Sequence, residues 1–425
     1  MLDIVRAADP DYASLRHVYG ATGAPDAILR PRTSEEVVEA LSFARETGGA
    51  LAIRSGGHGI SSISTNVGGT VIDLGRLDDV ERLDDRLVRV GPGARWGHVA
   101  EALSPWGLAI SSGDSGDVGV GGLATTGGIG LLGRAHGLTI DRMRAARLVT
   151  ADGGLHRVSA MEEPDLFWAV RGAGANIGIV TSFEFEAAPT SRVAQATLAY
   201  QLDDAADFFR RWGEAVERSP REISAFLYVG AGSVPFAQAT VVFSTDDVDA
   251  ARDALVPFTE LPGLLGQRAQ IVPYSRVPVT TDAPHNGQQT AFTHTGLADH
   301  LDEPVSRALA VLAGEGSTQM VQIRSAGGAI NDVPQNATAY AHRHQNFSVT
   351  AIADTWSARF DAAWEPVHEL MSGMYLSFES GRDPGRILEA FPPETLQRLR
   401  GIKTRWDPEG VFHQNFDVTE GASWR

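Results

Sequence analysis

The sequence contains no cysteine, and this absence excludes several kinds of site at once. Without thiols there is no disulfide, no thiolate nucleophile and no cysteine-ligated zinc or iron–sulfur centre. Long apolar runs are missing too, since no stretch approaches the roughly 20 apolar residues that a membrane span needs. The opening stretch, MLDIVRAADPDY, lacks the basic and apolar regions of a secretory signal. The sequence therefore predicts a cytoplasmic protein.

Positive charge is scarce as well. Lys and Arg number 36 against 53 Asp and Glu, which gives a formal net charge of -17. Such a surface is repelled by phosphate backbones and anionic lipids, and no basic stripe interrupts it. We therefore expect neither nucleic acid nor membrane as a partner, but a small-molecule substrate, with the protein a monomer or a homodimer.

The length of 425 residues favours two domains, and the element pattern changes near residue 190. Residues 25–190 alternate short strands with helices. Thr33 and Glu36 predict the start of a helix that ends before Gly48, and a strand over residues 50–54 follows it. Further strands are expected at 70–74 and 87–90, with a helix from about residue 95.

After residue 190 the pattern is that of strands followed by helices, without a glycine-rich phosphate loop. We expect helices at 205–218 and 248–255, strands at 223–229, 237–243, 320–324 and 348–353, and a long helix ending near residue 373. This order predicts an antiparallel sheet covered by helices, and so an α+β protein with two domains.

Three glycine clusters stand out in the first domain. IRSGGHGIS, residues 53–61, places His58 in a turn directly after a predicted strand. The cluster at 112–137 contains two matches to the dinucleotide fingerprint, but no apolar strand precedes either, which argues against NAD. The third runs through residues 165–185. Glycine turns allow backbone N–H groups to approach a ligand closely, so the clusters predict nests for one extended ligand that carries a pyrophosphate.

These clusters and two later motifs together resemble a known family. RSGGH at 54–58, GVGG at 119–122 and GAGANIGIVT at 172–181 resemble the FAD-binding domain of the vanillyl-alcohol oxidase superfamily, in particular its berberine-bridge-enzyme-like oxidoreductases. AYAHR at 339–343 resembles part of that family's substrate domain, and WDPEGVFHQN at 406–415 resembles its closing segment. The resemblance implies a PCMH-type FAD-binding domain at 1–190, a substrate domain at 191–404 and a segment at 405–425 that returns to the FAD domain.

The resemblance also implies FAD as cofactor, joined through a ring nitrogen of His58 to the 8α carbon of the flavin. A turn histidine that only packs or hydrogen-bonds is the alternative. The residues implied to bind FAD are His58, Arg54, Ser55, Gly56, Gly57, Gly59, Ser115, Gly116, Val118, Gly119, Gly121, Gly122, Thr126, Gly128, Ile179, Val180 and Asn415.

Two positions in the second cluster qualify the resemblance. Many relatives form a second flavin bond from a cysteine at the position of Ser115, and this chain has no thiol to form it. Relatives that react with dioxygen usually have valine where this chain has Val118. That residue favours an oxidase, and an ordinary apolar contact is the alternative.

The candidate base is Tyr375, in a stretch that matches the family's Tyr-x-Asn motif, except that Ser377 replaces the asparagine. A phenol, with an ordinary pKa near 10, needs a cationic or hydrogen-bonding neighbour to accept a proton at neutral pH, and the sequence places none. A tyrosine that only lines the pocket is the alternative. Tyr340 and His342 are further candidates, and we expect no metal at His342 and His344 because no carboxylate cluster accompanies them.

The implied reaction is dehydrogenation of a C–H next to oxygen or nitrogen, with dioxygen reoxidising the flavin to give hydrogen peroxide. Sugars, secondary-metabolite alcohols and amines all fit relatives. Two other functions stay open: a flavin dehydrogenase that uses another electron acceptor, and a flavin-binding protein without turnover.

Overall fold

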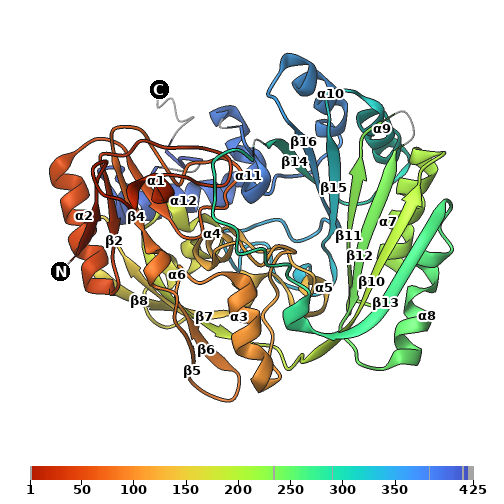
Figure 1. The fold of residues 1–425 in the computed structure, drawn as a ribbon, viewed down its shortest axis with the longest axis horizontal. Coiled ribbons are helices and arrows are strands. Elements are labelled where there is room, and N and C mark those ends of the chain that lie inside the picture. The colour runs from red at the N-terminus through yellow and green to blue at the C-terminus, as the bar shows by residue number, and fades with distance from the viewer. Residues whose placement is uncertain (1, 233–234, 290, 382, 414–415, 420–425) are drawn as a thin grey trace.

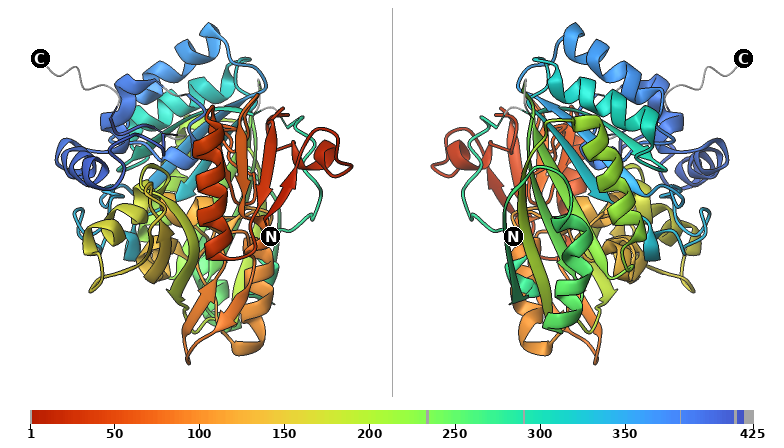
Figure 2. Two further views of the ribbon diagram at one scale, coloured as in Figure 1. Left: turned by 90° about the vertical axis from the view of Figure 1, so that its left-hand side faces the viewer. Right: turned by 90° about the vertical axis from the view of Figure 1, so that its right-hand side faces the viewer.

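The computed structural model describes residues 2–232, 235–289, 291–381, 383–413 and 416–419, and within them the strands form three sheets (Figure 1). We call the first two sheets and their helices the FAD domain, after the domain that the sequence leads us to expect there. The third sheet, with a layer of helices on one face, is called the substrate domain on the same expectation (Figure 2). This arrangement is α+β, as predicted.

The first sheet has the order β1-β2-β4-β3, and the first glycine cluster begins at the end of its strand β3. Helix α2 (Ser34–Thr47) begins at Thr33, whose hydroxyl accepts the N–H of Glu36 at 3.2 Å. It buries the face that carries Val37 and Leu41, and Gly48 ends it with φ of +68°. The chain then enters β3, which ends at Arg54. The strands are β1 (Asp3–Val5), β2 (Ala27–Arg30), β3 (Leu51–Arg54) and β4 (Thr70–Asp73).

The second sheet is antiparallel, with the order β5-β6-β9-β7-β8. Its apolar face packs against three helices around Trp96, Phe183 and Phe185, which are fully buried. The elements are β5 (Val80–Arg82), β6 (Leu87–Val90), β7 (Met143–Val149), β8 (Leu155–Ser159), β9 (Ile179–Glu186), α3 (Trp96–Leu103), α4 (Val120–Thr126) and α6 (Pro164–Ala173). Short helices α1 (Tyr12–Leu15) and α5 (Gly133–His136) lie in connections.

The third sheet has the order β13-β10-β12-β11-β15-β16-β14, and every pair in it is antiparallel. The predicted sheet covered by helices is thus confirmed. Its strands are β10 (Arg192–Gln201), β11 (Ile223–Gly230), β12 (Phe236–Phe243), β13 (Leu264–Pro273), β14 (Phe292–Ala298), β15 (Met320–Ser325) and β16 (Phe347–Ala353). The covering helices are α7 (Ala205–Arg218), α8 (Val248–Thr259), α9 (Glu303–Gly314) and α10 (Ala358–His368). Helix α10 ends at His368, earlier than the expected residue 373.

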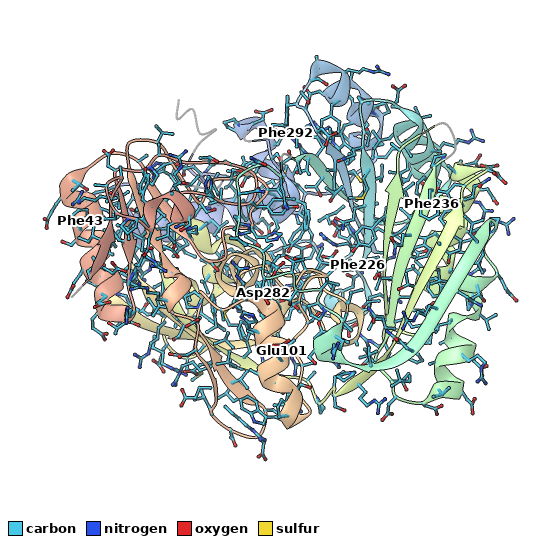
Figure 3. The ribbon with its side chains drawn as sticks, in the orientation of Figure 1. Phe43, Glu101, Phe226, Phe236, Asp282 and Phe292 are labelled. Carbon is cyan, nitrogen blue, oxygen red and sulfur yellow. The ribbon has the colours of Figure 1, made fainter. Side chains whose placement is uncertain are left out.

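Both faces of this sheet are covered, and alternation along β11 shows how. Ala225, Leu227 and Val229 pack in the core beneath the helices, whereas Phe226 points to the opposite face. There it lies toward the FAD domain (Figure 3) and packs with residues such as Leu131 in one apolar cluster. The two domains therefore share a core. No helix in the described ranges is long and apolar enough to cross a bilayer.

The end of the chain returns to the FAD domain through α11 (Ile387–Ala390) and α12 (Pro393–Trp406). Leu396 and Leu399 of α12 are buried in the same core as α6. This packing favours a return that begins before residue 405, so the boundary at 404 stays a proposal.

A buried lysine fixes this return. Lys403 is the only lysine in the sequence and is 1% exposed. Its ammonium donates to the carboxylate of Asp407 at 2.6 Å and to the carbonyls of Asn176 at 2.9 Å and Phe412 at 2.5 Å. The Asp407 carboxylate also accepts the N–H groups of Val411 and Phe412. One charged pair therefore joins α12 and the chain after it to the start of β9.

We expect Lys403→Met to destabilise the fold by about 3–5 kcal/mol, because it leaves the Asp407 carboxylate buried without its cation. Denaturant unfolding measures this loss. Arg398→Met is the matched control on the same helix: its ion pair with Asp165 is exposed, so its removal should cost no more than about 1 kcal/mol. Equal losses in the two variants would contradict the role of Lys403.

Candidate active site

The first glycine cluster is anchored by Arg54, at the end of β3. Its guanidinium donates to the carboxylate of Asp73 at 2.6 Å and to the carbonyl of Leu15 at 2.7 Å, and the pair is buried. Arg54 was expected to contact the cofactor, but these bonds favour a structural role in which it fixes the start of the loop.

The first and second clusters meet backbone to backbone. A Cβ on Gly56 would lie 2.6 Å from the nitrogen of Gly119, and a Cβ on Gly119 would lie 2.2 Å from the nitrogen of Gly56. The hydroxyl of Ser55 joins the same two loops, because it donates to the carbonyl of Pro92 at 2.5 Å and accepts the N–H of Gly121 at 3.1 Å. The structure therefore brings together two clusters that are about sixty residues apart in the sequence.

The loop that carries His58 has the features of an anion nest. The N–H groups of residues 56–59 donate no hydrogen bond to any other described residue, and Gly57 has φ of +67°. An added Cβ would meet no atom within 4 Å at Gly59 or at Gly122, so open space borders the backbone there. Successive free N–H groups beside open space suit the pyrophosphate of FAD. The residues present thus fit the expected cofactor.

The His58 ring is held between two other rings. It stacks on Tyr19, with centroids 4.4 Å apart and planes 28° apart, and contacts His285 edge to face at 5.5 Å. Burial, and then the neighbouring His285, hold the pKa of His58 below the ordinary histidine value. The imidazole is therefore neutral at neutral pH, which is the form that acts as a nucleophile.

His285 belongs to residues 278–289, here called the strap, which connect β13 to β14 and cross the FAD domain (Figure 1). The N–H of Gly116 donates to the carbonyl of Val279 at 2.7 Å. The carboxylate of Asp117 accepts the hydroxyl of Thr281 at 2.5 Å and its N–H at 3.0 Å. A cavity of about 50 Å³ lies between the strap and His58. The strap, which connects two strands of the third sheet, therefore contacts the proposed tether and shares a cavity with it.

Tyr375 lies at the seam between the domains and is 2% exposed. Its hydroxyl oxygen accepts the N–H of Gly128 at 2.9 Å, which supplies the hydrogen-bonding neighbour that the sequence could not place. A Cβ on Gly127 would lie 3.0 Å from the ring, so the glycine turn also makes room for it. Ser377, the residue that departs from the family motif, shares a hydrogen bond of 2.6 Å with Thr126. Gly128 and Thr126, both expected near the flavin, thus contact the segment of the candidate base.

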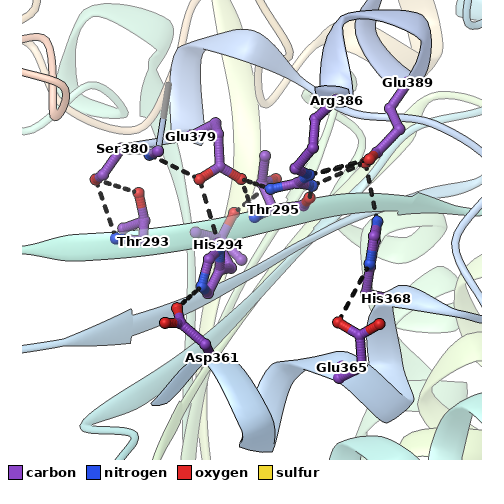
Figure 4. A network of polar contacts seen from close by, with 12 residues as sticks. Thr293, His294, Thr295, Asp361, Glu365, His368, Glu379, Ser380, Arg386 and Glu389 are labelled. Carbon is purple, nitrogen blue, oxygen red and sulfur yellow. Dashed lines mark hydrogen bonds and ion pairs between the residues drawn. The ribbon is translucent and has the colours of Figure 1, made fainter. Parts of the chain in front are cut away.

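A polar network holds the chain just after Tyr375 (Figure 4). The Glu379 carboxylate has no exposed side-chain surface and accepts from Arg386 at 2.7 Å and from the N–H of Thr295 at 3.2 Å. His294 lies between Asp361, at 2.9 Å, and Glu379, at 3.5 Å. Strand β14 and helix α10 are thereby tied to the segment that carries Tyr375.

The other two candidate bases lie differently. Tyr340 is close to Tyr375, with ring centroids 6.1 Å apart, and burial raises its pKa, so its ring is held as a neutral phenol. The His342 Nε2 is 3.1 Å from the carbonyl oxygen of Ala390, and burial lowers its pKa to about 4. The His342 ring also meets the Tyr340 ring edge to face at 5.6 Å, and this geometry favours a packing role for His342.

The remaining expected residues lie in the second glycine cluster, at the start of β9 and in the C-terminal segment. Ser115 and Gly116 pair with the strap, and the carbonyl of half-buried Val118 accepts the N–H of Trp96 at 3.0 Å. Ile179 and Val180 are buried at the start of β9. Asn415 lies outside the described residues.

Sequence reasoning missed a partly buried charged group at the same seam. Asp114 accepts from Arg324 at 3.0 Å and from the hydroxyl of Tyr228. Burial opposes its ionisation, but Arg324 and Tyr228 hold the pKa of Asp114 below its ordinary value. The Arg324 guanidinium lies 3.9 Å above the ring of Phe378, which packs on Tyr375. Asp114 directly precedes Ser115, so its place in the second cluster was the available signal, whereas Tyr228 and Arg324 had none.

Comparisons with known proteins agree with this geometry. Residues 25–159 match the FAD binding domain family. The (R)-6-hydroxynicotine oxidase of Paenarthrobacter nicotinovorans is 28% identical over 94% of this chain and 92% of its own length. Two solved structures share the fold, each with a TM-score of 0.85. BBE-like 1 of Physcomitrella patens is 23% identical and matches 97% of this chain and 95% of its own. The glucooligosaccharide oxidase of Acremonium strictum, described with a 6-S-cysteinyl, 8α-N1-histidyl FAD, is 21% identical and matches 98% and 97%.

The glycine loops, the fold and the matched domain lead to one assignment. The N-terminal part binds FAD, and the similarity to FAD-linked enzymes extends over nearly the whole chain. The chain therefore carries an FAD binding domain, is similar over nearly its whole length to FAD-linked oxidases, and shares the fold of a berberine-bridge-enzyme-like protein.

Proposed function

We propose that the protein is an oxidase that dehydrogenates a CH–OH or CH–N group of a small organic substrate, a sugar or a secondary metabolite. In this proposal FAD is joined to His58, and dioxygen takes up the electrons as hydrogen peroxide. The relatives named above include a nicotine oxidase and an oligosaccharide oxidase, which supports both substrate classes.

The observation that carries the proposal is the hydrogen bond between Gly128 and Tyr375. An N–H donated to the phenol oxygen at 2.9 Å fixes the orientation of the hydroxyl and stabilises negative charge on that oxygen. The hydroxyl proton has no acceptor among the described residues, so the oxygen has a direction left for the substrate. Tyr375 thereby removes the proton from the substrate's oxygen or nitrogen.

When bound, FAD supplies the acceptor for the hydride that leaves the substrate carbon. The chain's own residues orient and seal the reaction. The nest at residues 56–59 holds the pyrophosphate, the apolar seam around Phe226 and Tyr340 excludes water, and Arg324 stacks on the Phe378 ring behind Tyr375. With serine at position 115, His58 is the sole proposed covalent bond to the flavin.

The covalent bond predicts a yellow protein whose colour stays in the pellet after acid precipitation, because a histidyl bond survives denaturation. His58→Ala should release its flavin into the supernatant, and His413→Ala, an exposed histidine of the tail, should not. Absorbance of pellet and supernatant measures this. Release of flavin from the unaltered protein would contradict the tether.

Tyr375→Phe should slow anaerobic flavin reduction by roughly 10²- to 10⁴-fold, the usual contribution of a general base, and change substrate binding much less. Stopped-flow absorbance measures both. Tyr274→Phe is the matched control, because that buried tyrosine lies in the same cluster and also accepts a backbone N–H, that of Ser112 at 3.4 Å. A Tyr375→Phe variant that reduces its flavin within a few-fold of the unaltered protein would move the search to Tyr340.

Val118→Ile should slow reoxidation by dioxygen far more than reduction by substrate, because the added methylene narrows only the approach beside the flavin. Mixing the reduced protein with air-saturated buffer measures reoxidation. Equal effects on the two half-reactions would contradict a gating role. Slow reoxidation of the unaltered protein itself would favour the dehydrogenase alternative.

A further inference from the structure

His285 has no role in the reaction proposed above, yet it is one of the two rings in contact with His58. It comes from the strap, more than two hundred residues further along the chain, and the bonds of the strap to Gly116 and Asp117 fix it in place. Residues of the strap line one cavity together with His58, Tyr19 and Asp117. A histidine placed against another histidine beside an open cavity suggests that the pair acts on a common ligand.

The hydrogen bond of His285 fixes which ring nitrogen is free. Its Nε2 lies 2.8 Å from the carbonyl oxygen of Gly56, and a carbonyl can only accept, so Nε2 carries a proton. In the neutral ring Nδ1 then has a lone pair and no proton, and no described residue donates a hydrogen bond to it. His285 therefore has a ring nitrogen that can accept a proton, and its ring meets that of His58 edge to face with centroids 5.5 Å apart.

The surroundings keep both rings in the neutral form. Burial lowers the pKa of His285 as well as that of His58. Arg95 and Arg54 add to this effect at His285, and Asp117 opposes it. Of the two neutral imidazoles, one is available as a nucleophile and the other as its base.

We propose that His285 is the base that activates His58 when the protein attaches FAD to itself. The inference rests on the proposed tether. In the step, an N–C8α bond forms as one C–H bond of the flavin's 8α methyl group and the N–H bond of His58 break. The imidazole proton passes to Nδ1 of His285, and the two electrons left by the C–H bond pass, with both protons, to dioxygen, which becomes hydrogen peroxide.

The test uses His285→Gln, whose side-chain amide can still donate to the Gly56 carbonyl but offers no comparable base. The control is Gln288→Ala, an exposed residue of the strap that does not line the cavity. Each purified full-length protein is incubated with FAD in air, and intact-mass measurement under denaturing conditions follows the covalent fraction. We expect attachment in His285→Gln to be roughly 10²-fold slower or more. Reversible FAD binding should change by no more than a few-fold, and the control should attach FAD at the unaltered rate.

Added imidazole separates a chemical role from a structural one, because it supplies a base without repairing a misplaced strap. We expect it to restore attachment in His285→Gln. Attachment at the unaltered rate in this variant, or loss of reversible FAD binding without rescue by imidazole, would overturn the assignment. Failure of the tether is distinguishable, because then even the unaltered protein would show no covalent mass increase.

Discussion

The site depends on one close approach, that of the backbones of Gly56 and Gly119. Any side chain at either residue would overlap the other loop, so the spacing between β3 and the start of α4 is set by two residues without a Cβ. The Ser55 hydroxyl holds the same spacing by bonding both sides. His58 lies two residues after Gly56, and Val118 directly precedes Gly119. The contact between the two glycines therefore sets the positions of both the proposed tether and the proposed oxygen approach.

The arrangement around the proposed base forms only where the two domains pack together. Tyr375 approaches from the substrate domain, but the N–H that orients its hydroxyl belongs to Gly128 of the FAD domain. The partly buried Asp114 likewise belongs to one domain, while Arg324 and Tyr228 belong to the other. An apolar cluster shared by both domains surrounds these bonds, so neither domain alone has a complete arrangement of donors and acceptors.

Elements with a strong local signal could be predicted from the sequence. The cap at Thr33 located α2, and the apolar stretches at 223–229 and 237–243 located β11 and β12. Strand β13 was missed because it is an edge strand with mostly exposed residues, so it lacks the apolar alternation that identifies a half-buried strand.

What the sequence could and could not predict about the site has the same physical origin. The glycine clusters indicated where backbone meets a ligand, since glycine's freedom is a local property. The direction of a side chain is not local: Arg54 turns to Asp73 and His342 to Ala390, although both belong to motifs of the family. The partner of Tyr375 lies 247 residues away, and His285 lies in a connection with no pattern of its own.

The single lysine has a practical consequence beyond stability. Since its ammonium is enclosed by three oxygens and 1% of the residue is exposed, the folded protein offers no lysine side chain to acylating reagents. Amine-directed immobilisation or cross-linking through lysine would leave the native surface untouched. The rate at which Lys403 is acylated would instead report how often the C-terminal return detaches from the FAD domain.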